Sequence, residues 1–269
     1  MSAPRQLYRS ARRFAGRLLR RVPLVGKHLS ASSGYQILTK ERAVSEQAGG
    51  WYSARTAERQ QRAYQQLLAD MHAGRPRVDL TIAAHALRET KLSEPSILEV
   101  GCGGGYYSEI LRTLFGAVSS YDGIDSSPAM IADARAQYPN ETFSVGDACA
   151  LQFADASFDI VFNGVSLMHI IEYEKAIAES SRVARRFCIF HSVPVFQEHG
   201  TTYLKKYAYG SPVVEVVFAR SELLSVFRRH GLELLQSWRS IDYDVYPVVR
   251  KHSVCETYLL ATTLQQKDD

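Results

Sequence analysis

The chain has 269 residues, of which 46% are hydrophobic and 22% charged, so it can build a full hydrophobic core. No apolar run reaches the roughly 18 residues of a membrane-spanning helix, which excludes an integral α-helical membrane protein as the expected class. Its four cysteines, Cys102, Cys149, Cys188 and Cys255, lie far apart without C-x-x-C or zinc spacing. We therefore expect reduced thiols and a cytoplasmic protein.

The formal net charge of +4 is unevenly distributed. Residues 1–28 hold eight arginines and lysines and no acid, so the rest of the chain carries a net charge of −4. Apolar residues follow helical spacing over residues 5–22, which predicts a basic amphipathic helix within an arm of residues 1–34.

Such a helix is typical of peripheral contact with an anionic membrane surface. The alternatives are packing on the protein's own lid or in a homodimer, an organelle transit peptide, and nucleic-acid contact. The acidic body of the chain disfavours nucleic acid.

The next segment, residues 35–92, is predicted to be a helical cap. Helical periodicity covers about 53–73 and 78–90. Trp51 and Tyr52 stand just before the first of these helices, where they could close one side of a substrate pocket or simply belong to the core.

From residue 93 onward, short apolar segments alternate with helical ones. Strands are predicted at 96–100, 118–125, 142–145, 158–163 and 186–193, and later within "LELLQSW" and "ETYLLAT". Ser127 and Pro128 are favourable as the N-cap and first residue of the helix after the second strand. Alternation of this kind predicts a parallel α/β sheet, which binds ligands at the carboxyl ends of its strands.

The stretch "ILEVGCGGGYYSEIL" places four glycines in five residues between the first strand and a helix. Its pattern, E-x-G-x-G-x-G from Glu99 to Gly105, resembles motif I of the class I S-adenosylmethionine-dependent methyltransferases. A dinucleotide-binding turn would need a third glycine where this chain has Tyr106. We expect the glycines to make room for the methionine part of the cofactor, the alternative being a tight turn without a ligand.

Two acids support this resemblance, which covers about residues 93–265. Asp125 ends the second strand, where the family carries an acid that accepts hydrogen bonds from both ribose hydroxyls. In "GDACALQF", the resemblance implies that Asp147 contacts the adenine amino group and that the backbone N–H of Ala148 contacts the ring. The resemblance therefore implies a Rossmann-like fold, with a mostly parallel seven-stranded sheet flanked by helices, in a cofactor-binding domain of residues 93–269.

The expected cofactor is S-adenosylmethionine. The residues expected to bind it are Glu99, Gly101, Gly103, Gly105, Asp125, Ser126, Asp147, Ala148 and Asn163. No Asp, Glu and His cluster with ligand spacing is evident, so we expect no metal.

Two histidines at the ends of strands are candidate catalytic residues. His169 follows the fourth strand, and His191 lies near the end of the fifth. A histidine can act as a general base near neutral pH. The alternative for each, favoured for His191, is a buried histidine that is hydrogen-bonded to the backbone.

About 25 residues after the fifth strand are expected to roof the substrate pocket. Tyr203, Lys205 and Tyr207 in this insertion are predicted to bind substrate, together with Trp51 and Tyr52; Lys206 and Tyr209 lie in the same segment. The alternative is a solvated loop whose tyrosines pack on the lid.

Together these features predict a metal-independent methyltransferase that acts on oxygen or nitrogen of a small molecule. One alternative is a cofactor-binding partner subunit without catalysis, and another is an NAD-dependent oxidoreductase, which Tyr106 and Asp147 disfavour.

Overall fold

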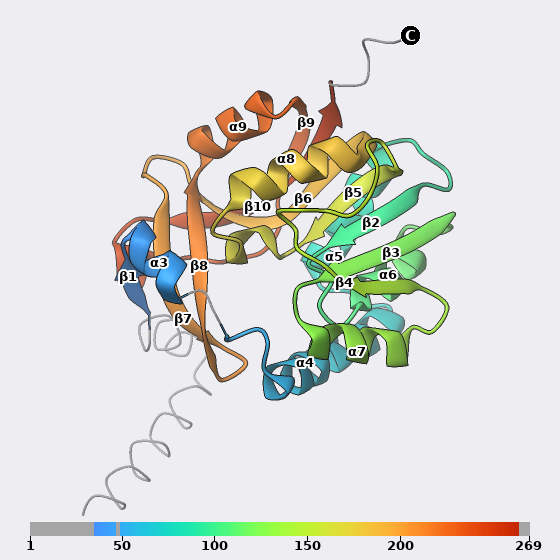
Figure 1. Cartoon of the computed structure of the whole chain (residues 1–269), viewed down its shortest axis with the longest axis horizontal. Helices are drawn as coiled ribbons and strands as arrows, with labels where there is room; N and C mark the ends of the chain where they lie inside the picture. Colours follow the sequence, from blue (N-terminus) through green and yellow to red (C-terminus); the bar gives the residue numbers. More distant parts are fainter. Residues whose placement is uncertain (1–34, 47–48, 264–269) are drawn as a thin grey trace, which may run out of the picture.

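The computed structural model describes residues 35–46 and 49–263 (Figure 1). The predicted arm, residues 1–34 with its amphipathic helix, lies outside this range, so its contact with a membrane or a second copy stays a prediction. Among the described residues, no helix is long and apolar enough to cross a membrane.

The centre of the molecule is a sheet in which seven strands run in the order β4-β3-β2-β5-β6-β10-β9. Strands β2 to β6 are parallel, and β10 pairs antiparallel with both β6 and β9. The strands span β2 (Ser96–Val100), β3 (Ser120–Asp125), β4 (Thr142–Val145), β5 (Phe158–Gly164), β6 (Ala184–Phe196), β9 (Leu232–Arg239) and β10 (Ser253–Thr262). This arrangement confirms the predicted fold class.

Helices cover both faces of this sheet because its strands are apolar on both sides (Figure 1). Leu98, Val161 and Phe190 face one core with the helices α8 and α9. Ile97 and Ile160 face a second core with α5, α6 and α7. The helices are α3 (Lys40–Glu46), α4 (Ala54–His72), α5 (Val78–Glu89), α6 (Tyr106–Leu114), α7 (Pro128–Gln137), α8 (Tyr173–Val183), α9 (Arg220–Arg229), α10 (Tyr246–Val249) and the 3₁₀ turn η1 (Leu167–His169).

The sheet in the described part of the chain has ten strands rather than the expected seven. The insertion after β6 is not a loop but an antiparallel hairpin of β7 (Thr202–Ala208) and β8 (Ser211–Ala219), and β1 (Gln36–Leu38) pairs with β7. The segment "SPVVEVVFA" is rich in valine, which favours strands, and it buries both of its faces. Since β1 comes from residues 35–92, the predicted cap region contributes to the sheet itself.

Strand β6 joins the hairpin to the central sheet. It pairs with β5 as far as His191 and then, at Val195 and Phe196, with β8. Because β5 ends at Gly164, the last residues of β6 extend beyond the carboxyl edge of its neighbour. The hairpin therefore stands in front of the edge where a parallel sheet binds its ligands.

The glycine turn between β2 and α6 has a backbone that other residues rarely adopt. Gly101, Gly103 and Gly105 have φ angles of 76°, 53° and 79°. A Cβ at Gly101 would lie 2.3 Å from the Cβ of Ser166, whereas one at Gly104 would meet nothing within 4 Å. A side chain at Gly101 would thus collide with the neighbouring loop, which is a second reason for glycine at this position beside the predicted contact with the cofactor.

We predict that Gly101→Ala lowers the free energy of unfolding by about 1–3 kcal/mol, because alanine would be strained at this φ and would displace Ser166. Gly104→Ala is the matched control, and its free energy of unfolding should change by less than about 1 kcal/mol. Urea denaturation of the two variants measures the difference. Equal stabilities would show that the turn tolerates a side chain at Gly101.

Candidate active site

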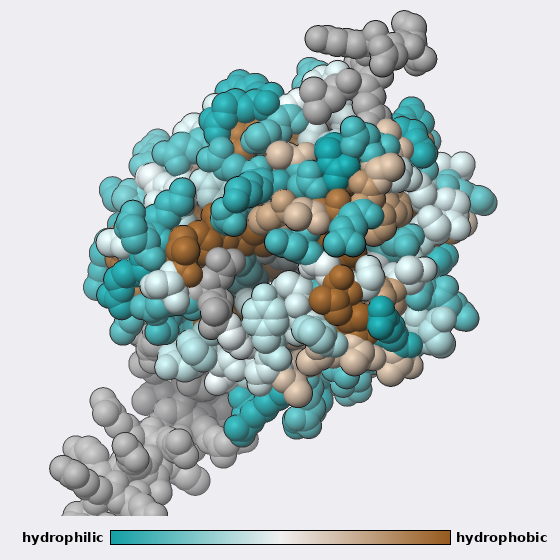
Figure 2. Space-filling view, in the orientation of Figure 1, coloured by the Kyte–Doolittle hydropathy of each residue, from teal (hydrophilic) through white to brown (hydrophobic). Residues whose placement is uncertain are grey.

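A cavity of about 930 Å³ opens at the carboxyl edge of the sheet. Its walls come from the Gly101–Gly105 turn, the ends of β3, β4 and β5, the helix α4 and the hairpin β7–β8. Figure 2 shows a recess near the centre of this face, with hydrophobic residues on two sides of it. The volume is in the range of sites that hold a cofactor or a drug-sized ligand.

Asp125, at the end of β3, forms one end of the cavity. Its Oδ2 accepts a hydrogen bond from the N–H of Gly103 at 2.9 Å, and its Oδ1 accepts one from the N–H of Ser127 at 2.8 Å. Burial raises the pKa of Asp125, and these two backbone donors oppose that rise. A carboxylate has about four acceptor positions, so this side chain can still accept hydrogen bonds from a ligand.

The loop after β4 lies beside Asp125 and carries Asp147. The N–H of Cys149 donates to Oδ1 of Asp147 at 2.8 Å, which orients the side chain. Ser126, Asp147 and Ala148 all line the cavity. The two acids that follow β3 and β4 are therefore brought together at one end, as expected from adjacent parallel strands.

A second polar cluster occupies the opposite end of the cavity. Lys206 on β7 pairs with Glu215 on β8, and the hydroxyl of Tyr243 donates to the other oxygen of Glu215. Glu215 is completely buried, whereas the Lys206 side chain is 16% exposed. The Lys206 ammonium also lies 5.2 Å from the centre of the Tyr243 ring.

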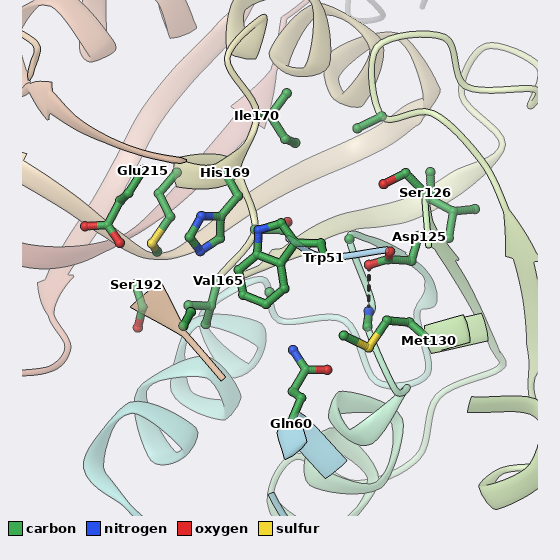
Figure 3. A pocket seen from close by; sticks show the side chains of 18 of the residues that line it. Trp51, Gln60, Asp125, Ser126, Met130, Val165, His169, Ile170, Ser192 and Glu215 are labelled. Atoms are coloured by element: carbon green, nitrogen blue, oxygen red, sulfur yellow. Dashed lines mark hydrogen bonds between the residues drawn. The ribbon is translucent and has the colours of Figure 1, made fainter. Parts of the chain in front are cut away.

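His169 and Trp51 lie between the two polar ends (Figure 3). Their ring centroids are 4.7 Å apart, and Trp51 also meets Tyr209 at 6.1 Å. The hydroxyl of Ser127, the N-cap of α7, donates to the carbonyl of Trp51 at 3.0 Å and so ties this residue to the start of α7.

The imidazole of His169 is partly buried and neutral. Its Nδ1 is 2.9 Å from the carbonyl of Val214, so Nδ1 carries the proton and donates it. Burial lowers the pKa of His169 to about 3; the nearby ammonium of Lys206 acts in the same direction, and the bond to Val214 opposes both.

The tip of the hairpin is joined to the start of α4, which closes the cavity on one side. Arg59 donates to the carbonyl of Tyr209 at 2.8 Å, and the hydroxyls of Thr56 and Ser211 are 2.7 Å apart. Tyr209 and two further residues that line the cavity, Val165 and Ser192, have positive φ angles of 50°, 62° and 53°. Backbone strain in non-glycine residues tends to gather at functional sites.

Comparison with known proteins agrees with this geometry. Residues 98–190 match a family model described as a methyltransferase domain. A probable S-adenosylmethionine-dependent methyltransferase from Mycolicibacterium smegmatis is 32% identical over 94 residues, which are 35% of this chain and 35% of that protein. A demethylmenaquinone methyltransferase from Chlorobaculum parvum is 36% identical over 92 residues, 34% and 37% of the two chains.

A third relative, a phthiotriol/phenolphthiotriol dimycocerosates methyltransferase from Mycobacterium leprae, is 37% identical over 112 residues, 40% of this chain and 41% of that protein. The chain thus spans between about a third and two fifths of the length of these relatives. The region that matches the family model, residues 98–190, holds the glycine turn, Asp125, Asp147 and His169.

Solved structures show the same fold. The [4+2]-cyclase SpnF superposes with a TM-score of 0.52 at 19% identity, over 68% of this chain and 80% of that one. An S-adenosylmethionine-dependent methyltransferase from Methanosarcina mazei gives a TM-score of 0.51 at 18% identity, over 66% and 97%. Residues 98–190 of this chain are therefore a methyltransferase domain of the class I S-adenosylmethionine-dependent type.

The cofactor of this methyltransferase domain is S-adenosylmethionine, and the Asp125 end of the cavity fits it. The open acceptor positions of Asp125 suit a ribose diol, and Asp147 lines the same cavity from the neighbouring loop. Beside Gly103 the cavity is occupied by the side chain of Gln60. Its flexible amide oxygen would be 2.9 Å from a Cβ at Gly103.

The structure brings many of the sequence-predicted residues to the methyltransferase cavity. They are Trp51, Tyr52, Gly101, Gly103, Asp125, Ser126, Asp147, Ala148 and His169. Their roles toward ligands stay predictions.

Four other predicted residues support the site without lining it. Asn163 accepts hydrogen bonds from Ser166 and Leu167 and so shapes the loop after β5. Gly105 begins α6, where a Cβ would press on Phe143. His191 is buried, as its structural alternative expects, but its partners are side-chain hydroxyls rather than the backbone: Nδ1 is 2.9 Å from Oγ1 of Thr257 and Nε2 is 3.2 Å from Oγ of Ser192.

Glu99 is the fourth, and it lies under the glycine turn. It is completely buried and accepts a hydrogen bond from Tyr121, while its Oε1 has no partner among the described residues. Burial raises the pKa of Glu99 to about 8, against the lowering effect of Tyr121.

The predictions on β7 need a correction because alternate residues of a strand point to opposite faces. Tyr203, Lys205 and Tyr207 do not line the cavity; Lys205 instead pairs with Glu46 at 2.6 Å, and Tyr207 is 65% exposed. Lys206 and Ala208 line the cavity in their place.

Sequence reasoning missed Gln60, Ser166, Glu215 and Tyr243. Glu215 had a usable signal, since it is the single acid in the apolar strand "SPVVEVVFA". A charge buried in such a strand is retained only with a partner. No comparable signal marks Gln60 or Ser166, which reach the cavity from other elements.

We predict that Glu99→Gln stabilises the cofactor-free protein, and increasingly so as pH rises from 5 to 8. The raised pKa means that the folded state keeps a proton that the unfolded chain has released, so the wild type loses stability through this interval. Between pH 5 and 8, the difference in free energy of unfolding between variant and wild type should grow by an amount on the order of 3–5 kcal/mol. His169 and His191 change the stability with pH in the opposite direction, because burial lowers their pKa values. Their contribution is the same in variant and wild type, so it cancels in the difference.

Urea denaturation at pH 5, 6, 7 and 8 measures this difference. Glu233→Gln, on the exposed part of β9, is the control and should follow the wild type at every pH. A difference that stays constant from pH 5 to 8 would show that Glu99 is ionised in the folded protein.

Proposed function

We propose that this protein is a methyltransferase that transfers a methyl group from S-adenosylmethionine to a small molecule. The observation that carries the proposal is a single cavity with Asp125 and Asp147 at one end and the Lys206–Glu215 pair at the other. One end suits the cofactor, which leaves the other for an acceptor. Relatives named for demethylmenaquinone and for phthiotriol dimycocerosates support an acceptor of metabolite or lipid type.

The bound cofactor supplies a methyl group that is already activated on a sulfonium sulfur, so the protein has mainly to align an acceptor and exclude water. Asp125 would hold the ribose, and Asp147 the adenine. Trp51, fixed by Ser127, would cover the reacting centre, and the joined hairpin tip would keep water out.

His169 is proposed to meet the acceptor. Its bond to Val214 keeps the proton on Nδ1, which makes Nε2 the basic nitrogen. With a pKa of about 3, this imidazole is neutral at physiological pH and holds an extra proton only briefly. It would therefore orient the acceptor and pass on a proton rather than store one.

We predict that Asp125→Asn weakens the binding of S-adenosylhomocysteine by about 10- to 100-fold, because the amide can no longer accept hydrogen bonds at both positions. Asp122→Asn, on the same strand but outside the cavity, should bind as the wild type does. Isothermal calorimetry measures both. Unchanged affinity in Asp125→Asn would remove the ribose role, and tighter binding of NADH than of S-adenosylhomocysteine would overturn the proposed function.

We predict that His169→Phe lowers turnover by about 10²-fold or more and leaves S-adenosylhomocysteine affinity within threefold of wild type. Phenylalanine keeps the packing on Trp51 but has no ring nitrogen. Transfer of labelled methyl from the cofactor to a panel of hydroxyl and amine compounds provides the assay. Turnover within threefold of wild type would make His169 a packing residue, and cofactor binding without transfer to any acceptor would favour a non-catalytic partner subunit.

A further inference from the structure

The polar cluster at the acceptor end is built by the register of the hairpin. Lys206 stands opposite Val213, so Glu215, two residues further along β8, is its diagonal neighbour on the same face. Tyr243 reaches this face from the segment between β9 and β10, and its hydroxyl is also 3.2 Å from that of Tyr35. Lys206 and Tyr243 thus contact Glu215 from two separate parts of the chain, and Tyr35 contacts Tyr243.

Lys206 and Glu215 differ in what they can offer to a ligand. Both oxygens of Glu215 already accept hydrogen bonds, from Lys206 and from Tyr243, and the residue is completely buried. An ammonium has three donors, and among the described residues only Glu215 is hydrogen-bonded to that of Lys206. Lys206 is also the exposed member of the pair, so a ligand in the cavity meets a donor.

We propose that Lys206 binds the acceptor oxygen and that the substrate is a phenol or enol held as its oxyanion. This inference rests on the proposed methyltransferase function and decides between oxygen and nitrogen as the acceptor atom. The hydroxyl gives up its proton by way of Nε2 of His169 to solvent as the oxyanion binds. Its oxygen then forms a bond to the methyl carbon, the bond from that carbon to sulfur breaks, and the electron pair of that bond stays on sulfur.

Charge balance favours an oxyanion over an amine. Glu215 already neutralises Lys206, and the carboxylates of Asp125 and Asp147 stand at the other end of the cavity. At the acceptor end a sulfonium therefore brings a positive charge that an adjacent oxyanion cancels. A protonated amine would instead stand beside two cations at low dielectric, where like charges repel strongly. The other groups near Lys206 add no charge: burial lowers the pKa of His169 and raises the pKa of Cys255, so both are neutral near pH 7.

The walls between the two ends suit a flat ring. Trp51, His169 and Tyr209 form a continuous aromatic surface with centroid separations of 4.7 and 6.1 Å. Aromatic pairs prefer such offset or edge contacts, which would add to the burial of a planar substrate. A phenol or enol presents both a planar group and an acidic hydroxyl.

The test uses the full chain saturated with sinefungin, a cofactor analogue that carries an ammonium where the sulfonium methyl group would be. The probe is 4-nitrophenol, because its phenolate and phenol forms absorb at different wavelengths. At the pH where half of the free probe is ionised, the bound probe should be mainly phenolate. Its neutral isostere 4-nitrotoluene should bind about 10- to 100-fold more weakly. Absence of phenolate binding, or equal binding of the two probes, overturns the oxyanion site.

Lys206→Met should reduce phenolate affinity by about 10- to 100-fold and abolish the shift toward phenolate. Lys205→Met, on the opposite face of the same strand, is the matched control and should retain both. Because Lys206→Met leaves a buried carboxylate unpaired and risks misfolding, the double variant Lys206→Met/Glu215→Gln removes both charges together.

The double variant should bind S-adenosylhomocysteine within threefold of wild type and show the same loss of phenolate binding. If it binds phenolate as the wild type does, Lys206 is not the oxyanion site. Failure of the wild type to bind S-adenosylhomocysteine is a separate outcome, and it overturns the proposed function rather than this inference alone.

Discussion

The length of strand β6 is the constraint on which the rest of the site depends. The strand pairs with β5 as far as His191 and then continues to Val195 and Phe196, where it pairs with β8. Without these extra residues the hairpin β7–β8 would have no strand to join. The hairpin in turn supplies Lys206 and Glu215, the carbonyl that orients His169, and the tip that meets α4.

The charged side chains that line the cavity are gathered at its two ends. Asp125 and Asp147 stand at one end, at the carboxyl edge of parallel strands, and the Lys206–Glu215 pair stands at the other. Aromatic rings lie between them, so the two ends share a region of low dielectric in which charges act strongly. An arrangement of this kind can hold two different polar molecules with their reactive groups together in the middle.

Burial, rather than neighbouring charge, sets the protonation of the titratable groups around this cavity. Desolvation is the first cause of the low pKa of His169 and of the raised pKa values of Glu99 and Asp125. Each of these groups also has one or two hydrogen bonds, which shift its pKa in the direction opposite to burial. The site is therefore held in one protonation pattern by packing, and loosening that packing would change its chemistry.

The amino-acid sequence by itself determined the alternating strands and helices, the glycine turn, and Asp125 and Asp147 after successive strands. These features are local, because periodicity, capping residues such as Ser127 and the glycine backbone act within a few residues. Strand periodicity also predicts that alternate residues of β7 share a face, but the prediction named Tyr203, Lys205 and Tyr207, which lie on the face away from the cavity. Only the tertiary structure decided that Lys206, Glu215 and Tyr243 meet, and that Glu99 and His191 support the site from beneath it. Their positions depend on the pairing of strands far apart in the chain, and long-range pairing leaves no periodic signal in the residues that it joins.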